Sequence, residues 1–287
     1  MERLFGVGWL PRLDGIELST LYGLASEMAG KMSISGVQEK VSLALSSDRS
    51  ELQISPRGGR YILKPEPARY SSVPQNEHVT MLMASLVGIE TPPFGLVWLK
   101  DHTPAYVIKR FDRLDDGSKL HVEDFCQLSE SPLKDKYRGS GELCVRILRK
   151  YASEPLIEIR KLYKILLFTW WVANGDQHLK NLSLLIGPDG ICRLAPAYDL
   201  LCTRLVIPKD TDLSLSIGGK KAKLTRRSWL DFAEYCEISK KASERLLAEQ
   251  ITATGPALEL IGRSFLPEKL QQRFMEIVNA STAVLSE

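Results

Sequence analysis

The sequence contains neither an apolar stretch long enough to cross a membrane nor a C-x-x-C pair of cysteines. Its longest strongly apolar run covers residues 165–173, far short of the ~18 residues that a membrane span needs. The N-terminus, MERLFGVGWLPRLDG, carries charges where a signal peptide would be apolar. The five cysteines are scattered and odd in number, which argues against a disulfide framework or a zinc site. These absences predict a cytoplasmic protein with no membrane association.

Internal repeats, low-complexity tracts and a strong excess of one charge are missing as well. No unit of ~20 to 50 residues recurs. A net charge of +3 and a pI near 8.5 are too mild to indicate a nucleic-acid-binding protein by themselves. The 287 residues do include 44% hydrophobic and 25% charged residues, which is enough for a large core or for two lobes sharing a cleft.

The hydrophobic pattern changes along the chain from strand-like to helix-like. Alternating residues predict a hairpin over 33–55 and strands at 60–65, 92–100 and 104–113. The intervening helix has Asn76 as its expected N-cap and Gly88 just past its end. Helices are expected at 121–130, 141–153, about 155–173 and over the last sixty or so residues, with a second hairpin at 182–200 turning at 188–190. This order predicts an α+β protein with a β-rich first lobe, residues 1–112, and a helical second lobe, residues 113–287.

A polar island interrupts the apolar pattern in WWVANGDQHLKNLSLLI, residues 170–186. Asp176 and Asn181 have the D-x4-N spacing of a protein-kinase catalytic loop, and Asp199 follows after the hairpin. Phosphoryl transfer needs one carboxylate to orient the attacking hydroxyl, and an amide oxygen with a second carboxylate to hold Mg²⁺. Lys180 and His178 could neutralise charge on the transferring group. The alternative is a polar turn whose side chains satisfy backbone groups after the helix.

The first part of the chain offers the other half of a nucleotide site. In SISGVQEK, residues 33–40, Gly36 sits in a turn that could bring backbone N–H groups close to phosphates. The segment matches neither of the common glycine-rich phosphate motifs, so it is weak evidence alone. Lys64 lies on the next strand, where a phosphate-binding lysine would be, and Glu77 could hold it as an ion pair. Most lysines near strand ends are merely solvated.

Taken together, these segments resemble the HipA-like serine/threonine kinases of bacterial toxin–antitoxin modules. The matching stretches, in the family's order over residues 33–220, are SISGVQEK, YILKP, NEH, VIKRFDR, HVEDFCQ, NGDQHLKN, LAPAYDL and LSLSIGGK. The resemblance implies a bilobal protein-kinase-like fold that uses ATP and Mg²⁺. It makes Asp176 the catalytic base and Asn181 and Asp199 the metal ligands. The residues it implies for the nucleotide are Lys40 and Lys64 at the phosphates, Lys109 to Phe111 at the adenine, Asp112 near the ribose, and Gln127 and His178 lining the site.

The resemblance also implies regulation and partners. Only 32 residues precede Ser33, which is similar to the short HipT type, whose missing N-terminal subdomain is replaced by a small companion protein. A helix-turn-helix DNA-binding antitoxin is expected, with DNA bound only indirectly through it, and the implied target is an aminoacyl-tRNA synthetase. Ser33 corresponds to an autophosphorylation site, with Ser35 a second candidate; added phosphate would repel nucleotide or move the loop. Without the family, both serines could be small polar residues of a tight turn.

Other interpretations stay open at this point. The basic run GKKAKLTRR, residues 219–227, could engage an acidic target, a target-bound tRNA or operator DNA, or it could be a solvated face. The D-x4-N loop would equally suit a small-molecule kinase. A non-catalytic pseudokinase that binds partners is a third possibility, although the intact Lys64, Asp176, Asn181 and Asp199 argue against it.

Overall fold

The structure, a computed structural model, describes residues 1–13, 17, 40–55 and 58–287. The chain divides into two compact units. The first comprises Met1–His78 and Pro92–Ser118, and the second Val79–Thr91 and Lys119–Glu287. The boundary between them falls inside one helix, α3 (Val73–Leu86).

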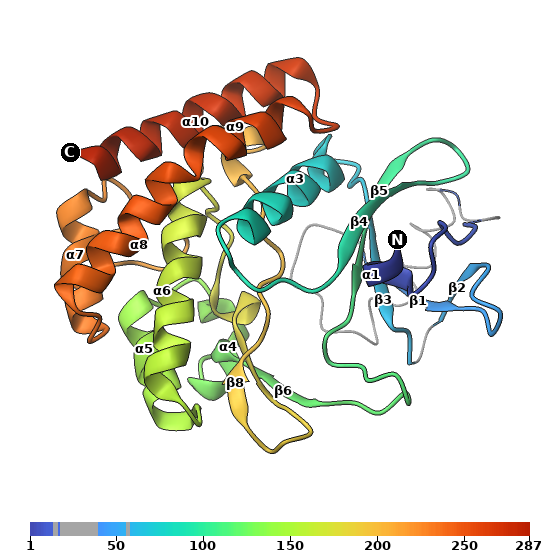
Figure 1. Ribbon diagram of the computed structural model, residues 1–287, viewed down its shortest axis with the longest axis horizontal. Helices are drawn as coiled ribbons and strands as arrows, with labels where there is room; N and C mark the ends of the chain where they lie inside the picture. Colours follow the sequence, from blue (N-terminus) through green and yellow to red (C-terminus); the bar gives the residue numbers. More distant parts are fainter. Residues whose placement is uncertain (14–16, 18–39, 56–57) are drawn as a thin grey trace. The chain divides into compact units, whose positions relative to one another are not determined.

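The first unit is built around an antiparallel sheet with the strand order β2-β1-β3-β5-β4 (Figure 1). A short helix, α1 (Glu2–Phe5), adds Leu4 and Phe5 to the core beneath the sheet. The predicted hairpin is confirmed for residues 41–54, whereas residues 33–39 lie outside the described residues. The other predicted strands are also present. The strands are β1 (Val41–Leu45), β2 (Leu52–Ile54), β3 (Tyr61–Pro65), β4 (Phe94–Trp98) and β5 (Pro104–Lys109).

The predicted N-cap of α3 is wrong. The helix begins at Val73, so Asn76 lies inside it. Pro74 stands in the first turn, where proline's fixed φ suits a helix and its missing N–H costs nothing. This start signal lies upstream of the asparagine and outweighs it. The other end is confirmed, because Gly88 adopts a left-handed φ of 72° just past the helix.

The second unit consists mainly of helices. Their central member is α6 (Pro155–Trp171), whose C-terminal half, from Ile165 to Trp171, is buried on every side, as expected for a helical segment that is apolar all round. Figure 1 shows α9 and α10 lying side by side, in orange and red. The helices that the sequence predicted in this part are confirmed as α5 (Gly141–Tyr151), α6 (Pro155–Trp171), α7 (Arg226–Tyr235), α8 (Lys240–Thr252), α9 (Thr254–Gly262) and α10 (Glu268–Ser286).

A small antiparallel sheet, ordered β6-β7-β8, completes the second unit. The second predicted hairpin is confirmed as β7 (Ser183–Ile186) and β8 (Cys192–Leu194), with Gly190 at a φ of 74° in its turn. The helix predicted over residues 121–130 is largely wrong, because its first part is strand β6 (His121–Asp124) paired with β7. Only α4 (Phe125–Leu128) is helical there. Short 3-10 turns lie at η1 (Leu133–Asp135), η2 (Leu179–Asn181) and η3 (Thr203–Leu205).

In the part of the chain that the structure describes, no helix combines the length and the apolar character that crossing a membrane would require.

Candidate active site

A buried lysine and glutamate form an ion pair in the first unit. Strand β3 places Lys64 opposite Tyr106 of β5, and the Glu77 carboxylate on α3 lies 2.5 Å from the Lys64 ammonium. The two side chains are only 4% and 1% exposed, and the ammonium also lies 5.4 Å from the centre of the Tyr106 ring. The predicted ion pair is confirmed, and it fixes a positive charge inside the first unit.

Two arginines form hydrogen bonds with the carboxylate of Asp112, just beyond the end of β5. Arg110 donates to both carboxylate oxygens, at 2.8 and 2.7 Å, and Arg113 donates to Oδ2 at 2.5 Å. Burial alone would raise the pKa of Asp112, but the hydrogen bonds and positive charges of these arginines outweigh it and lower that pKa. The carboxylate is therefore charged and already bonded, and a ribose would have to share its oxygens.

The backbone beside Asp112 is also engaged. The N–H groups of Lys109 and Arg110 donate to the carbonyls of Pro93 and Arg60, each at 2.8 Å. A base recognised by this stretch would have to use its other backbone groups. Burial, with the neighbouring charge of Arg60, lowers the pKa of Lys109. Lys40 lies immediately before β1 and is partly buried.

In the second unit the chain reverses sharply after α6, because Ala173 is left-handed with a φ of 52°. The N–H of Asn174 then donates to the carbonyl of Thr169 at 2.8 Å, the bond that closes a helix whose last turn ends in a left-handed residue. The Asn174 side chain in turn accepts a hydrogen bond from the N–H of Asp176 at 3.1 Å. The polar island therefore starts as a tight, internally bonded loop.

Thr203 holds this loop from another part of the chain. Its hydroxyl accepts from the N–H of Gly175 at 2.9 Å and donates to the carbonyl of Ala173 at 3.2 Å. A Cβ on Gly175 would lie 2.4 Å from the Asp210 carboxylate and 2.7 Å from the carbonyl oxygen of Thr211, so a glycine is required there. Sequence reasoning missed Thr203, because no motif links it to the loop.

Asp176 and His178 present the chemical groups of the loop. Asp176 is partly exposed, and its Oδ1 accepts a hydrogen bond from the Tyr137 hydroxyl at 2.6 Å. His178 is only 1% exposed. Its burial is the largest influence and lowers its pKa, whereas the charges of Asp176 and Asp199 act in the opposite direction. Both carboxylates therefore lie close enough to affect one imidazole, which stays neutral near pH 7.

Asn181 and Asp199 lie side by side. The Asn181 amide nitrogen donates to Oδ2 of Asp199 at 3.5 Å, a weak hydrogen bond. Asp199 has a φ of 57°, a left-handed conformation that few residue types other than glycine, asparagine and aspartate adopt readily. Amide and carboxylate oxygens are the ligands that Mg²⁺ prefers, so this pair fits the expected ion. Within the described ranges, no group of three or more His, Cys, Asp and Glu side chains could hold a metal, so phosphate oxygens and water would have to complete the coordination.

Three buried polar atoms of the loop lack a hydrogen-bond partner in the described structure. They are Nδ2 of Asn174, Oε1 of Gln177 and Nδ1 of His178. Such atoms are rare in folded proteins, and each needs a water, an ion or a ligand to complete it. Their concentration in one loop is typical of a binding site.

Two further residues of the expected site have local partners. Gln127 and Asp124 form a reciprocal capping box at the start of α4, with both hydrogen bonds at 2.9 Å. The Lys180 ammonium lies 3.4 Å from the Asp124 carboxylate. Gln127 thus already has a structural role in starting the helix. Ser33 and Ser35 lie outside the described residues.

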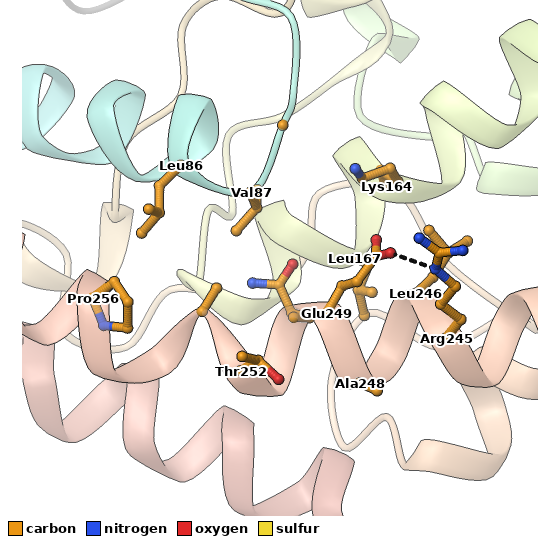
Figure 2. Close-up of a pocket in the computed structure, with 13 residues that line it drawn as sticks. Leu86, Val87, Lys164, Leu167, Arg245, Leu246, Ala248, Glu249, Thr252 and Pro256 are labelled. Carbon is orange, nitrogen blue, oxygen red and sulfur yellow. Dashed lines mark hydrogen bonds and ion pairs between the residues drawn. The ribbon is translucent and has the colours of Figure 1, made fainter.

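A separate hollow of about 560 Å³ lies in the second unit (Figure 2). Leu86, Val87 and Leu167 give it an apolar wall, and an ion pair of Arg245 and Glu249, 2.9 Å apart, stands at one end. None of the residues expected in the active site lines it. Its size therefore says nothing about the chemistry of the loop after α6.

Comparisons with known proteins agree with the expected family. The family model described as the HipA-like C-terminal domain matches residues 32–257. A candidate kinase from Sinorhizobium fredii is 29% identical over 245 residues, which make up 82% of this chain and 58% of that protein. The serine/threonine-protein kinase toxin HipA of Shewanella oneidensis is 24% identical over 207 residues, or 65% of this chain and 47% of the toxin. The chain thus spans about half the length of these relatives.

A solved structure extends the similarity to the fold. HipA of Shewanella oneidensis, determined with HipB and operator DNA, superimposes with a TM-score of 0.73 at 20% identity, covering 88% of this chain and 64% of that one. At such low identity the match concerns the fold alone. It confirms the predicted α+β, kinase-like fold.

Proposed function

Because the chain belongs to the family of the HipA-like C-terminal domain, we propose that it is an ATP-dependent protein serine/threonine kinase that acts as the toxin of a toxin–antitoxin module. The loop after α6 carries the proposal. In this loop Asp176 is partly exposed, and Asn181 lies beside Asp199, which follows the later hairpin. The charges of Asp176 and Asp199 both influence the pKa of His178. Residues 1–112 would bind the nucleotide, and residues 113–287 would supply the catalytic groups.

Each group has a distinct role in phosphoryl transfer. Asp176 accepts a hydrogen bond from the acceptor hydroxyl and takes its proton as the phosphoryl group arrives. Asn181 and Asp199 would hold Mg²⁺, and the ion would supply positive charge to neutralise the phosphates. Lys64, which Glu77 holds at 2.5 Å, would supply a positive charge for nucleotide phosphates. Positioning and charge neutralisation, rather than covalent chemistry by the protein, carry the reaction.

The remaining nucleotide contacts are assigned by analogy with the family. Lys40 would assist Lys64 at the phosphates, and the stretch from Lys109 to Phe111 would contact the adenine. Asp112 would lie near the ribose, where it would share oxygens that its arginines already use. Gln127 and His178 would line the site.

Regulation and partners follow the same analogy. Transfer of phosphate to Ser33 or Ser35 would place about −1.5 to −2 charges in the nucleotide loop and inactivate the enzyme. The HipA relative was solved with HipB and operator DNA, which supports a HipB-like, DNA-binding antitoxin for this chain. A small companion protein and an aminoacyl-tRNA synthetase as target complete the proposal.

Labelling with γ-³²P-ATP and Mg²⁺ tests the enzyme. The purified chain, added to a cell lysate, should label a single protein band, and the Asp176→Asn variant should label none. Label confined to small metabolites would instead favour a small-molecule kinase. Growth arrest that persists with Asp176→Asn, in the absence of labelling, would favour a non-catalytic binding module.

Mass spectrometry tests self-inactivation. Phosphate on Ser33 or Ser35 is expected in the wild-type chain and not in Asp176→Asn. Equal phosphate in both chains would show that another kinase adds it and would remove this part of the proposal.

A further inference from the structure

Tyr137 lies between α4 and α5, outside every motif of the sequence, yet it contacts the proposed catalytic base. Its hydroxyl donates to Oδ1 of Asp176 at 2.6 Å, the length of a strong hydrogen bond to a charged acceptor. Burial, followed by this hydrogen bond, raises the pKa of Tyr137. The hydroxyl therefore keeps its proton and acts as a donor throughout the physiological pH range.

The tyrosine is fixed to the same unit as the catalytic loop. Its carbonyl accepts a hydrogen bond from the Lys221 ammonium at 2.7 Å. Its ring meets the His178 ring edge to face, with centres 5.0 Å apart, and the Lys136 ammonium lies 4.8 Å from the ring centre. The neighbouring carbonyl of Lys136 accepts from the N–H of Leu179 at 3.2 Å. These contacts fix the backbone at Tyr137 and place its ring against His178, while the residue as a whole is 41% exposed.

Such a contact limits how the carboxylate can turn. Asp176 sits on a partly exposed loop, and its side chain has two torsions that packing alone would leave poorly defined. Tyr137 occupies one oxygen, and within the described structure the other, Oδ2, accepts no hydrogen bond from the protein. A carboxylate can accept several hydrogen bonds at once, so an acceptor hydroxyl can bind Oδ2 while Tyr137 stays in place.

We propose that Tyr137 is a positioning residue for phosphoryl transfer, which holds Asp176 through Oδ1 so that Oδ2 faces the acceptor hydroxyl. This inference rests on the proposed kinase function. A small displacement of a catalytic group lowers the rate of the chemical step. It does not lower the affinity for the nucleotide. The loss of Tyr137 should therefore appear in kcat.

The Tyr137→Phe variant removes only the hydroxyl and leaves the ring against His178. We expect kcat to fall roughly tenfold to a hundredfold, the range for losing a hydrogen bond to a charged group, while KM for ATP is unchanged. Tyr151→Phe is the matched control, because Tyr151 ends α5 and its ring packs under Lys150. It should keep the wild-type kcat. Thermal unfolding of both variants verifies that they fold alike.

The outcomes separate the inference from the function on which it rests. An active wild type with an equally active Tyr137→Phe would overturn the positioning role. A variant faster than wild type would also overturn it, because Tyr137 would then compete with the acceptor. A rise in KM for ATP with kcat retained would point to nucleotide binding instead and contradict the inference. A wild-type chain without kinase activity would overturn both proposals.

Discussion

Replacing Glu77 by glutamine should destabilise the first unit strongly, because it removes the carboxylate that faces the buried Lys64 ammonium. The two side chains are 4% and 1% exposed and lie 2.5 Å apart. At this depth water cannot solvate the remaining charge, and breaking one partner of a buried pair costs about 3 to 5 kcal/mol. Urea unfolding followed by circular dichroism measures this loss as a lower midpoint.

Two further variants make the test specific. Lys100→Met breaks a surface pair, since the Lys100 and Glu17 side chains are 63% and 43% exposed and 3.0 Å apart. It should cost no more than about 1 kcal/mol. A double variant, Lys64→Met with Glu77→Met, replaces the pair by apolar side chains and should recover most of the lost stability, yet it should not bind ATP. Equal losses for Glu77→Gln and Lys100→Met, or a double variant as unstable as the single one, would refute this reasoning.

Three other changes have defined outcomes. Burial lowers the pKa of His78 to about 4, so the stability that comes from its neutral form is complete above about pH 6.5 and is lost as the pH falls towards about 4. The His78→Gln variant should flatten the pH dependence of the unfolding free energy over that window. An unchanged slope would contradict the assignment. Ala173→Gly should relieve the backbone at a φ of 52° and raise the unfolding free energy by up to about 1 kcal/mol, seen as a higher melting temperature with labelling activity retained. Asp199→Gly should relieve similar strain at a φ of 57° but lower phosphoryl transfer strongly and raise the Mg²⁺ concentration that half-maximal activity requires. A variant with wild-type activity and an unchanged Mg²⁺ dependence would argue against Asp199 as a ligand.

The parts of the site that the sequence predicted are those with local signals. Asp176 and Asn181 are predicted from their spacing within one loop, and the pairing of Lys64 with Glu77 is suggested by their places on a strand and on the helix after it. Tyr137 could not be found in this way, because 39 positions separate it from Asp176 and no pattern records a single tyrosine in an irregular connection. Only the folded chain brings the two together.

The errors in the fold have the same physical origin. The segment at residues 121–130 was predicted as a helix from its own composition, but residues His121–Asp124 pair with Ser183–Ile186, about sixty positions later. Strand character that comes from a distant partner is not encoded in the strand's own periodicity. Asn76 was a reasonable cap by residue type, and Pro74, which starts the helix earlier, is a stronger constraint because its φ is fixed.

The loop after α6 combines several locally unfavourable features. It begins at a left-handed alanine, its three unpartnered polar atoms are buried, and the left-handed Asp199 lies beside it. Each of these features destabilises the folded state, and together they persist only because the surroundings determine the loop fully. That support is visible in the buried side chains of α6, which lead directly into the loop, and in Thr203 and Tyr137, which bond to it from elsewhere. Features of this kind are expected where a protein keeps polar groups aimed at a ligand instead of at each other. These features fit the proposed active site, which the D-x4-N spacing already indicates.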